Sequence, residues 1–395
     1  MRTATAMHGM LSCLAPRRPR AEGRGRRYAP TLAWAMAWVM ACALLASATA
    51  SAQFRYTDGI RQRDAELLQR QIAALTPQRA GTVDLYTLGF AGDSTENVFR
   101  NEVHYFEDLM RQRFGADGRT LALVNHADSL FVRPRPLATL ENLRTALAGI
   151  GDAMDPDEDM LLLFMTMHGS RNHRLQVQMA PAISEWLSPE DIREALDDAG
   201  IRNRVVVISA CFSGGFIPAL RDEHTAVLTA ARANRPSFGC GTESVATYFG
   251  RAWMIEGLNA TTDPLAAFDS ARTRIRERER AEGFDPSLPQ RHIGNGIRRT
   301  LAAWQAQLQP GPPLAYPYVE EAPDVQTADK DGRGLIRHNG PRPTDKGRDR
   351  ASGPAPADDA ALEASQDDAE SRVEDVLDDP HADGAAQDGP STSRH

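Results

Sequence analysis

The sequence predicts an α/β domain with a mainly parallel central sheet and helices on both faces, an α/β/α sandwich, over residues 81–308. Short apolar runs alternate with amphipathic segments of helical period, as the crossover connections of a parallel sheet require. Residues 159–170 and 204–211 are almost continuously apolar, as expected of strands covered on both faces. The composition, 42% hydrophobic and 25% charged, is that of a globular chain able to bury such a core.

Strands are expected where apolar residues run together or alternate between turn signals. The predicted strands are residues 83–90, 120–127, 159–170, 204–211 and 225–231, and residues 174–179 form one arm of a small hairpin.

Helices are expected where apolar residues recur with helical spacing. The predicted helices are residues 97–115, 139–154, 188–200, 245–258, 263–282 and 295–308. Thr139 is a suitable N-cap residue, and Ser188 stands before a proline at the first helical position. Gly200 then closes that helix.

Residues 1–52 read as a targeting segment. An arginine-rich start precedes a long apolar run, and Ala50-Ser51-Ala52 fits the small-x-small rule for signal-peptide cleavage. The alternative is a retained anchor that tethers the chain to the membrane, because residues 31–50 are about long enough to span a bilayer. Both interpretations keep the positive charge inside, so we expect an exported protein, either periplasmic or anchored to the inner membrane and facing the periplasm.

Two more segments flank the predicted domain. Residues 53–80 read as an N-terminal helical extension, and residues 309–395 as a proline-rich exit followed by an acidic tail. Few large apolar residues occur in that tail, so we expect disorder from about residue 320. The net charge of -8 argues against a nucleic-acid partner.

Residues of catalytic type follow two of the predicted buried strands. His168 and Gly169 come after one strand, and Cys211 comes after another, ahead of a run of small residues. Ligands of open parallel sheets bind beyond the carboxyl ends of the strands, so both positions fall where a site is expected. A thiol needs a base or a neighbouring imidazolium to become a thiolate at neutral pH. The pair therefore predicts a nucleophile and its histidine, facing each other across a crevice.

Alternative roles for His168 and Cys211 stay open. A single histidine after a strand is more often a polar loop residue, and a single cysteine there is more often a packing residue. A disulfide between Cys211 and Cys240 suits an exported protein. A zinc site that adds His173 is weaker, because the chain lacks Cys-x-x-Cys and His-x-x-x-His spacing. We expect no metal and no cofactor.

The stretches LLLFMTMHGS (161–170) and VVVISACFSGGF (205–216) together resemble the legumain-type cysteine peptidases, family C13 of the caspase-like clan. The resemblance is greatest to the bacterial exported branch. In that clan one strand ends in His-Gly and a second in Ala-Cys, as His168-Gly169 and Ala210-Cys211 do here. The resemblance extends over about residues 81–294, and it includes GFAGDSTENVF, LTAARANRPSFGCG and TYFGRAW.

The resemblance implies a caspase-like fold and a cysteine peptidase that acts on peptide or protein substrates. Cys211 is the implied nucleophile, and His168 the group that protonates the leaving amine. The amides of Gly169 and Cys211 are the implied oxyanion donors, and Ser237 the implied wall of the substrate cleft. The second hypothesis is a non-catalytic caspase-like module that binds peptides or envelope proteins.

The chain departs from the asparagine-cutting members at the specificity residues. Those members carry an acidic residue two places before the cysteine, where this chain has Ser209. A second pocket acid is replaced by Arg251, whereas Arg100 matches an arginine of the family. Two acids are lost and positive charge is kept, so the resemblance favours an acidic P1 residue bound through Arg100 and Arg251. The alternative for Arg251 is a solvent position or an ion pair with Glu243.

Overall fold

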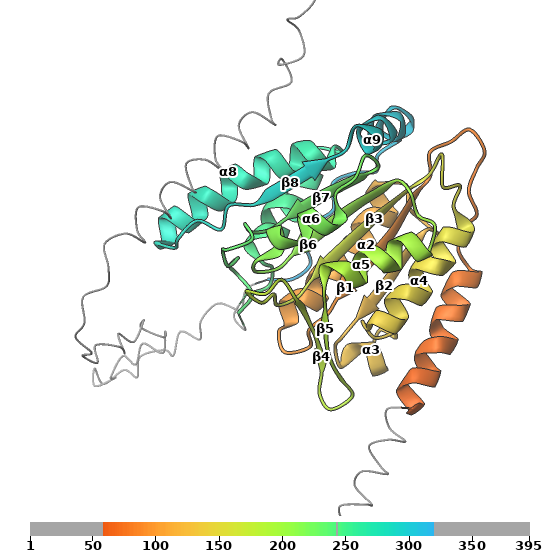
Figure 1. Ribbon diagram of the computed structural model, residues 1–395, viewed down its shortest axis with the longest axis horizontal. Helices are drawn as coiled ribbons and strands as arrows, with labels where there is room; N and C mark the ends of the chain where they lie inside the picture. The colour runs from red at the N-terminus through yellow and green to blue at the C-terminus, as the bar shows by residue number, and fades with distance from the viewer. Residues whose placement is uncertain (1–57, 242–243, 320–395) are drawn as a thin grey trace, which may run out of the picture. The chain divides into compact units, whose positions relative to one another are not determined.

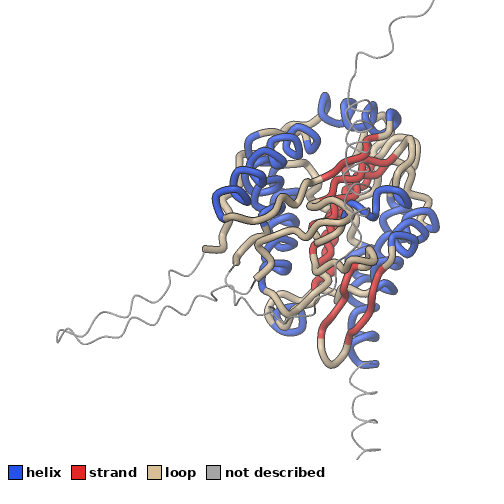
Figure 2. Tube along the Cα trace, turned by 60° about the vertical axis from the view of Figure 1, so that its left-hand side comes forward, coloured by secondary structure: helices blue, strands red, loops and turns tan. Residues whose placement is uncertain are grey.

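The computed structural model describes residues 58–241 and 244–319, and every structural statement concerns these ranges. A six-stranded sheet has the order β2-β1-β3-β6-β7-β8. Its strands are β1 (Leu85–Ala91), β2 (Thr120–Val124), β3 (Met160–Thr166), β6 (Arg204–Ser209), β7 (Thr225–Thr229) and β8 (Gln290–Ile293). Neighbouring strands are parallel except β7 and β8, which are antiparallel. The predicted fold class, a mainly parallel sheet with helices on both faces, is confirmed (Figures 1 and 2).

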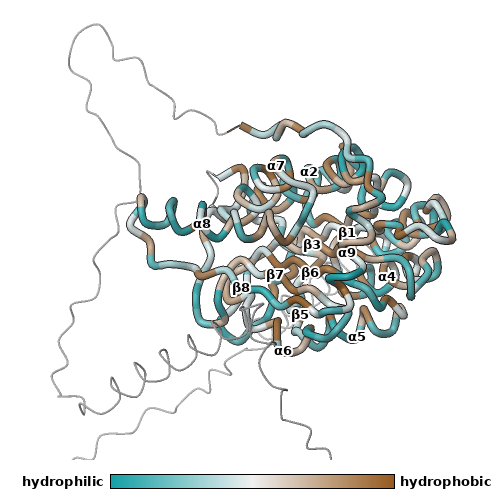
Figure 3. The backbone as a smooth tube through the Cα atoms, turned by 90° about the horizontal axis from the view of Figure 1, so that it is seen from above, coloured by the Kyte–Doolittle hydropathy of each residue, from teal (hydrophilic) through white to brown (hydrophobic). Residues whose placement is uncertain are grey.

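Helices cover both faces of this sheet. The labelled α-helices are α2 (Asn97–Arg113), α3 (Asp128–Phe131), α4 (Leu140–Ala153), α5 (Pro189–Asp198), α6 (Ile217–Leu220), α7 (Leu258–Ala260), α8 (Pro264–Glu282) and α9 (Asn295–Gln307). A 3-10 turn, η1, spans Ser213–Phe216, and a π-helix, η2, spans Gly250–Gly257. Another helix occupies residues 58–73. The central strands β3, β6 and β7 are the most apolar part of the domain, whereas the outer helices alternate between polar and apolar residues (Figure 3).

Two hydrophobic clusters divide the core along the sheet. One cluster joins α2, η2, α8 and α9 to one face of the strands. The other joins the helix at 58–73, α4, α5 and α6 to the opposite face. Because alternate residues of each strand point to opposite faces and both faces are covered, residues 160–165 of β3 are all apolar.

The predicted helix signals act as expected. The Thr139 hydroxyl accepts a hydrogen bond from the Asn142 amide at the start of α4. At α5, Ser188 and Asp191 form a reciprocal capping box, with Pro189 at the first helical position. Gly200 adopts a left-handed conformation (φ 66°) after α5, as a closing glycine does.

Some elements differ from the prediction. The sequence does not predict β8, because its four residues are half-buried and largely polar. The arm at 174–179 exists as β4 (Leu175–Met179), and it pairs with β5 (Ile183–Leu187) in a hairpin that projects from the domain (Figure 1). The segment predicted as one helix at 245–258 becomes helical only at Tyr248 and continues as η2 from Gly250, because residues 244–247 form a loop.

Segments on both sides of residues 81–308 pack on the domain. Leu68, in the helix at 58–73, is buried in the second cluster. Residues 311–318, here called the C-terminal segment, pack alongside α2. Gly311 hydrogen-bonds Arg113 near the end of that helix, and the Tyr318 hydroxyl lies 3.3 Å from His104 Nδ1.

The predicted targeting segment and acidic tail lie outside the described residues. Within the described ranges, no helix combines the length and the apolar character needed to cross a membrane.

Candidate active site

The sheet brings His168 and Cys211 to the same edge of the molecule. β3 and β6 are adjacent and parallel, with Thr166 paired to Ser209 in register. His168 and Cys211 each stand two residues beyond that pair, and both are partly exposed. The two predicted catalytic residues therefore leave neighbouring strands at the same level, at the carboxyl edge where ligands of such sheets bind.

Ser237, in the loop after β7, supplies two hydrogen-bond donors to the Cys211 sulfur. The Ser237 amide lies 3.2 Å from Sγ, and the Ser237 hydroxyl lies 3.6 Å from it. The Ser237 carbonyl oxygen lies 3.5 Å from the same sulfur, so Ser237 offers Cys211 Sγ both donors and an acceptor. The sequence predicts Ser237 as a wall of the cleft, and the structure places it directly against the sulfur.

His168 is held by its main chain and by an aromatic ring. Its carbonyl accepts a 2.9 Å hydrogen bond from the Gln176 amide in β4. The Phe99 ring of α2 meets the imidazole edge-on, with ring centroids 5.1 Å apart. Burial raises the pKa of Glu96, also at the start of α2, and the charge of His168 partly offsets that rise. The imidazole therefore packs against an apolar ring, and its charge acts on the Glu96 carboxyl group.

Two main-chain amides at this edge are available to a ligand. Within the described ranges, neither the Gly169 amide nor the Cys211 amide donates to a protein acceptor. A Cβ atom on Gly169 would lie 2.1 Å from the Cys211 carbonyl oxygen, so any larger residue would push the two loops apart. These unpaired N–H groups are the donors that an oxyanion requires.

A buried polar network, which sequence analysis does not predict, joins α2 to the end of β3 and to the loop before η2. Glu102 of α2 is fully buried and accepts hydrogen bonds from Thr166 Oγ1, Thr247 N and Thr247 Oγ1, each at 2.7 Å. Burial raises the pKa of Glu102, and these hydrogen bonds act in the opposite direction. The one available signal is its helical position, three residues after Phe99 on the buried face of α2.

The predicted specificity residues occupy different surroundings. Ser209 is 2% exposed, and its hydroxyl lies 3.1 Å from Thr247 Oγ1, so the predicted substrate contact has almost no exposed surface there. Arg100 forms an ion pair with Asp128, and its guanidinium carbon lies 5.8 Å from the centroid of the Tyr318 ring.

Arg251 lies in η2 and is partly exposed. Its charge acts on the buried hydroxyl of Tyr316, in the C-terminal segment. Glu243, the ion-pair partner considered for Arg251, lies outside the described residues. The C-terminal segment therefore lies beside both of the arginines that the sequence assigns to the P1 residue.

Cys211 and Cys240 are both free thiols, so the structure contains no disulfide between them. Burial, followed by the nearby charge of Cys211, raises the pKa of Cys240 to about 11. Across the described residues, no group of three or more histidine, cysteine or acidic side chains could hold a metal ion.

Comparison with known families supports a peptidase. Residues 144–300 match the family model of the peptidase C13 family, and this segment includes both His168 and Cys211. No curated protein gave a significant sequence match. Among solved structures, the crystal structure of caspase-1 from Spodoptera frugiperda is 11% identical with a TM-score of 0.39, and the match covers 56% of this chain and 93% of that chain.

Proposed function

We propose that the chain, whose residues 144–300 match the peptidase C13 family, is a cysteine-type peptidase that cleaves peptide bonds through a dyad of His168 and Cys211. The observation that carries this proposal is the register of β3 and β6, which sets the two residues at equivalent positions beyond adjacent strands. The substrates are peptides or proteins.

The proposed reaction has two stages. The Cys211 thiol gives its proton to His168, and the sulfur attacks the carbonyl carbon of the scissile bond. The amides of Gly169 and Cys211 hold the resulting oxyanion. His168 returns the proton to the leaving amine nitrogen as the C–N bond breaks, which leaves a thioester on Cys211. Water, deprotonated by His168, then releases the acid and regenerates the thiol.

A thiol-directed peptide probe tests this dyad. We expect the probe to label the wild-type protein and the Cys240→Ser control, but neither Cys211→Ser nor His168→Ala. Equal labelling of wild type and Cys211→Ser would contradict the proposal. Absence of labelling in all four proteins would favour the second hypothesis, a non-catalytic module that binds peptides.

We also propose that the substrate pocket prefers an acidic P1 residue, through Arg100. The charge of Arg100 supports this preference, but its ion pair with Asp128 competes with the substrate. The expected selectivity for Asp over Asn is therefore modest in the wild type and larger in Asp128→Asn, where the competing carboxylate is removed. A P1 scan with Asp, Asn and Arg peptides measures it, and faster cleavage after Arg would refute it.

Export remains a proposal that rests on residues 1–52. N-terminal sequencing of the mature chain, after expression in a Gram-negative host, should find Gln53 at the start if the signal is cleaved. Recovery of an intact N-terminus in the membrane fraction would support the tethered form. A soluble cytoplasmic product with an intact N-terminus would contradict export.

A further inference from the structure

Three alternate residues of the loop after His168, namely Gly169, Arg171 and His173, contact Cys211 and the turn that follows it. Gly169 meets the carbonyl oxygen of Cys211. The guanidinium carbon of Arg171 lies 5.2 Å from the centroid of the Phe212 ring. His173 lies against Gly215. The two catalytic loops are thus joined side by side, and His173 makes the contact farthest along the chain from His168.

His173 is the most constrained residue of that loop. Its backbone is left-handed (φ 55°), a conformation that non-glycine residues adopt at a cost. A 2.9 Å hydrogen bond from its amide to the Ser170 carbonyl closes the turn. Its Nε2 atom lies 3.1 Å from the Ala233 carbonyl oxygen, so Nε2 carries the proton and donates it.

The His173 ring lies so close to position 215 that only a glycine fits there. A Cβ atom on Gly215 would lie 2.2 Å from His173 Cγ and Cδ2, far inside contact distance. Gly215 belongs to the 3-10 turn η1, which begins two residues after Cys211. The imidazole therefore lies directly on the main chain of the nucleophile's own turn.

The hydrogen bond of His173 links a third loop to the other two. Its acceptor, Ala233, lies in the loop after β7, four residues before Ser237, whose amide points at the Cys211 sulfur. In the same loop, the Arg235 carbonyl accepts a hydrogen bond from the Phe212 amide. His173 thus contacts the turn that carries the nucleophile and the loop that donates to its sulfur.

We propose that His173 is a positioning residue that fixes the His168 loop at its working distance from Cys211. The inference rests on the proposed dyad and assigns His173 no contact with substrate. A rigid link of this kind matters because a displacement of about 1 Å in reacting groups can lower the rate about 100-fold.

The first test replaces the histidine. We expect His173→Ala to lower kcat about 10- to 100-fold, with KM within about twofold of wild type, because the reacting groups move while the cleft stays intact. His173→Gln, whose amide nitrogen can reach the Ala233 carbonyl, should recover most of the activity.

The pH profile of Cys211 alkylation separates positioning from folding. We expect the alkylation profile of His173→Ala to lie at higher pH than that of wild type, because a displaced His168 no longer assists the Cys211 thiol. A change in melting temperature with an unchanged profile would mean that His173 acts on stability alone, and would overturn the inference.

The second test exploits the close contact with Gly215. Gly215→Ala should reduce kcat strongly in the wild type, because its methyl group cannot share space with the His173 ring. In the His173→Ala background the same substitution should cost little, since the space is then free. Equal losses in both backgrounds would overturn the inference. Wild-type activity in Cys211→Ser would instead remove the proposed dyad itself, so the two failures are distinguishable.

Discussion

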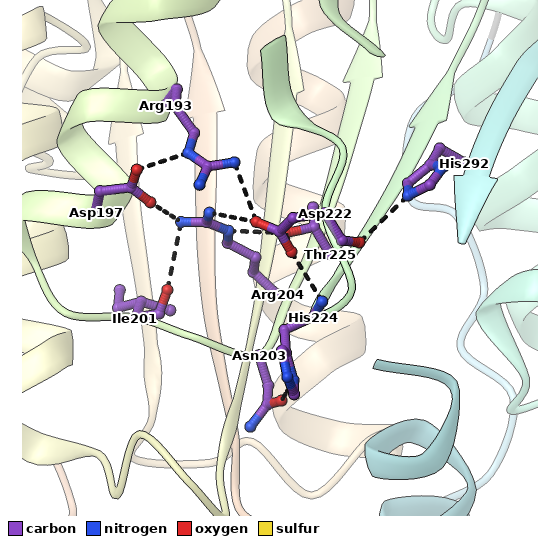
Figure 4. A network of polar contacts seen from close by, with 9 residues as sticks. All are labelled: Arg193, Asp197, Ile201, Asn203, Arg204, Asp222, His224, Thr225 and His292. Carbon is purple, nitrogen blue, oxygen red and sulfur yellow. Dashed lines mark hydrogen bonds and ion pairs between the residues drawn. The ribbon is translucent and has the colours of Figure 1, made fainter. Parts of the chain in front are cut away.

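The two edges of the central sheet differ in how far their buried polar groups are hydrogen-bonded. At the amino edge, where β6 begins, Arg204 is 3% exposed yet every part of its guanidinium is bonded. It donates to Asp197, Asp222, Thr225 Oγ1 and the Ile201 carbonyl at 2.8 to 3.3 Å (Figure 4). Burial alone would raise the pKa of Asp222, but hydrogen bonds from Thr225 and Arg204 outweigh it and lower that pKa.

A second polar group lies at the same edge, where β1 and β3 begin. The carboxylate of Asp84 pairs with Arg79 and Arg119. Its amide donates a 2.8 Å hydrogen bond to Asp159, the residue before β3. Pairing and hydrogen bonding offset part of the cost of burying the Asp84 carboxylate, although Arg119 Nε has no partner among the described residues, and these bonds join the starts of β1 and β3.

The carboxyl edge leaves polar groups without partners. Among the described residues, Asp93 Oδ2 and Glu96 Oε2 are buried without a hydrogen bond. The amides of Gly169 and Cys211 also lack a protein acceptor. Unsatisfied groups reduce stability, and they gather where a substrate can satisfy them. The difference teaches that one edge stabilises the sheet while the other is reserved for chemistry.

The sharpest test of this contrast is Cys211→Ala at the carboxyl edge. We expect kcat/KM to fall at least about 10⁴-fold, as when a nucleophile is removed from a protease. The melting temperature should stay within about 2 °C, because the partly exposed thiol contributes little to the core. Peptide hydrolysis and thermal unfolding measure the two effects. A large drop in melting temperature would break the contrast.

Arg204→Met tests the amino edge. Removing this buried cation leaves Asp197 and Asp222 with fewer partners, and we expect a loss of about 3 kcal/mol in the free energy of unfolding. The folded fraction should keep its kcat/KM. Arg193→Met is the matched control, since Arg193 pairs with the same two carboxylates but is one-third exposed, and should cost less than about 1 kcal/mol. Equal losses in the two variants would show that burial does not decide the cost.

Glu102 sharpens the comparison, because it is a buried acid near the catalytic edge. Glu102→Ala should cost about 2–4 kcal/mol, since it leaves a cavity and orphans the hydroxyl of Thr166 and the amide of Thr247. Glu102→Gln keeps the shape and most hydrogen bonds.

The Glu102 pKa sets the sign of a pH effect. Burial raises this pKa above the value in the unfolded chain. The contribution of protonated Glu102 to folding stability is therefore fully present at low pH and is lost as pH rises. Glu102→Gln should therefore gain stability relative to wild type between pH 5 and pH 8, as urea unfolding would show. A relative loss over that interval would contradict it.

The smallest expected effect concerns His104. Burial, together with the charges of Arg133, Arg100 and Arg135, lowers the pKa of His104 to about 3. The unfolded chain takes up this proton below about pH 6.5, so the contribution of neutral His104 is lost as pH falls from there towards 3. His104→Asn should weaken the pH dependence of unfolding by about 1 kcal/mol per pH unit between pH 6 and 4. Identical slopes for the two proteins would refute this.

Some of this molecule is predictable from sequence because burial leaves a local pattern. β3 and β6 are recognisable because both of their faces are covered and their central residues form continuous apolar runs, residues 160–165 and 205–208. β8 is not, because its half-exposed polar residues have no such pattern. His168 and Cys211 are predicted from their places after buried strands.

The rest of the site depends on contacts between distant parts of the chain. Ser209 ends a fully buried strand, and no neighbouring residue in the sequence indicates that its hydroxyl hydrogen-bonds Thr247. Glu102 has the sequence surroundings of an ordinary surface acid, and only the packing of α2 turns it inward. The contact between His173 and Gly215 joins residues 42 positions apart, and no spacing rule predicts it.

The unequal surroundings of the two thiols have a practical consequence for enzymology. With a pKa of about 11, Cys240 is about 0.1% thiolate at pH 8, so it reacts slowly with electrophiles. A stoichiometric alkylating reagent at that pH would consume one equivalent per competent molecule of a chain that lacks residues 1–52, where the other two cysteines lie. Active-site titration would then count working molecules in any preparation directly, without a known substrate.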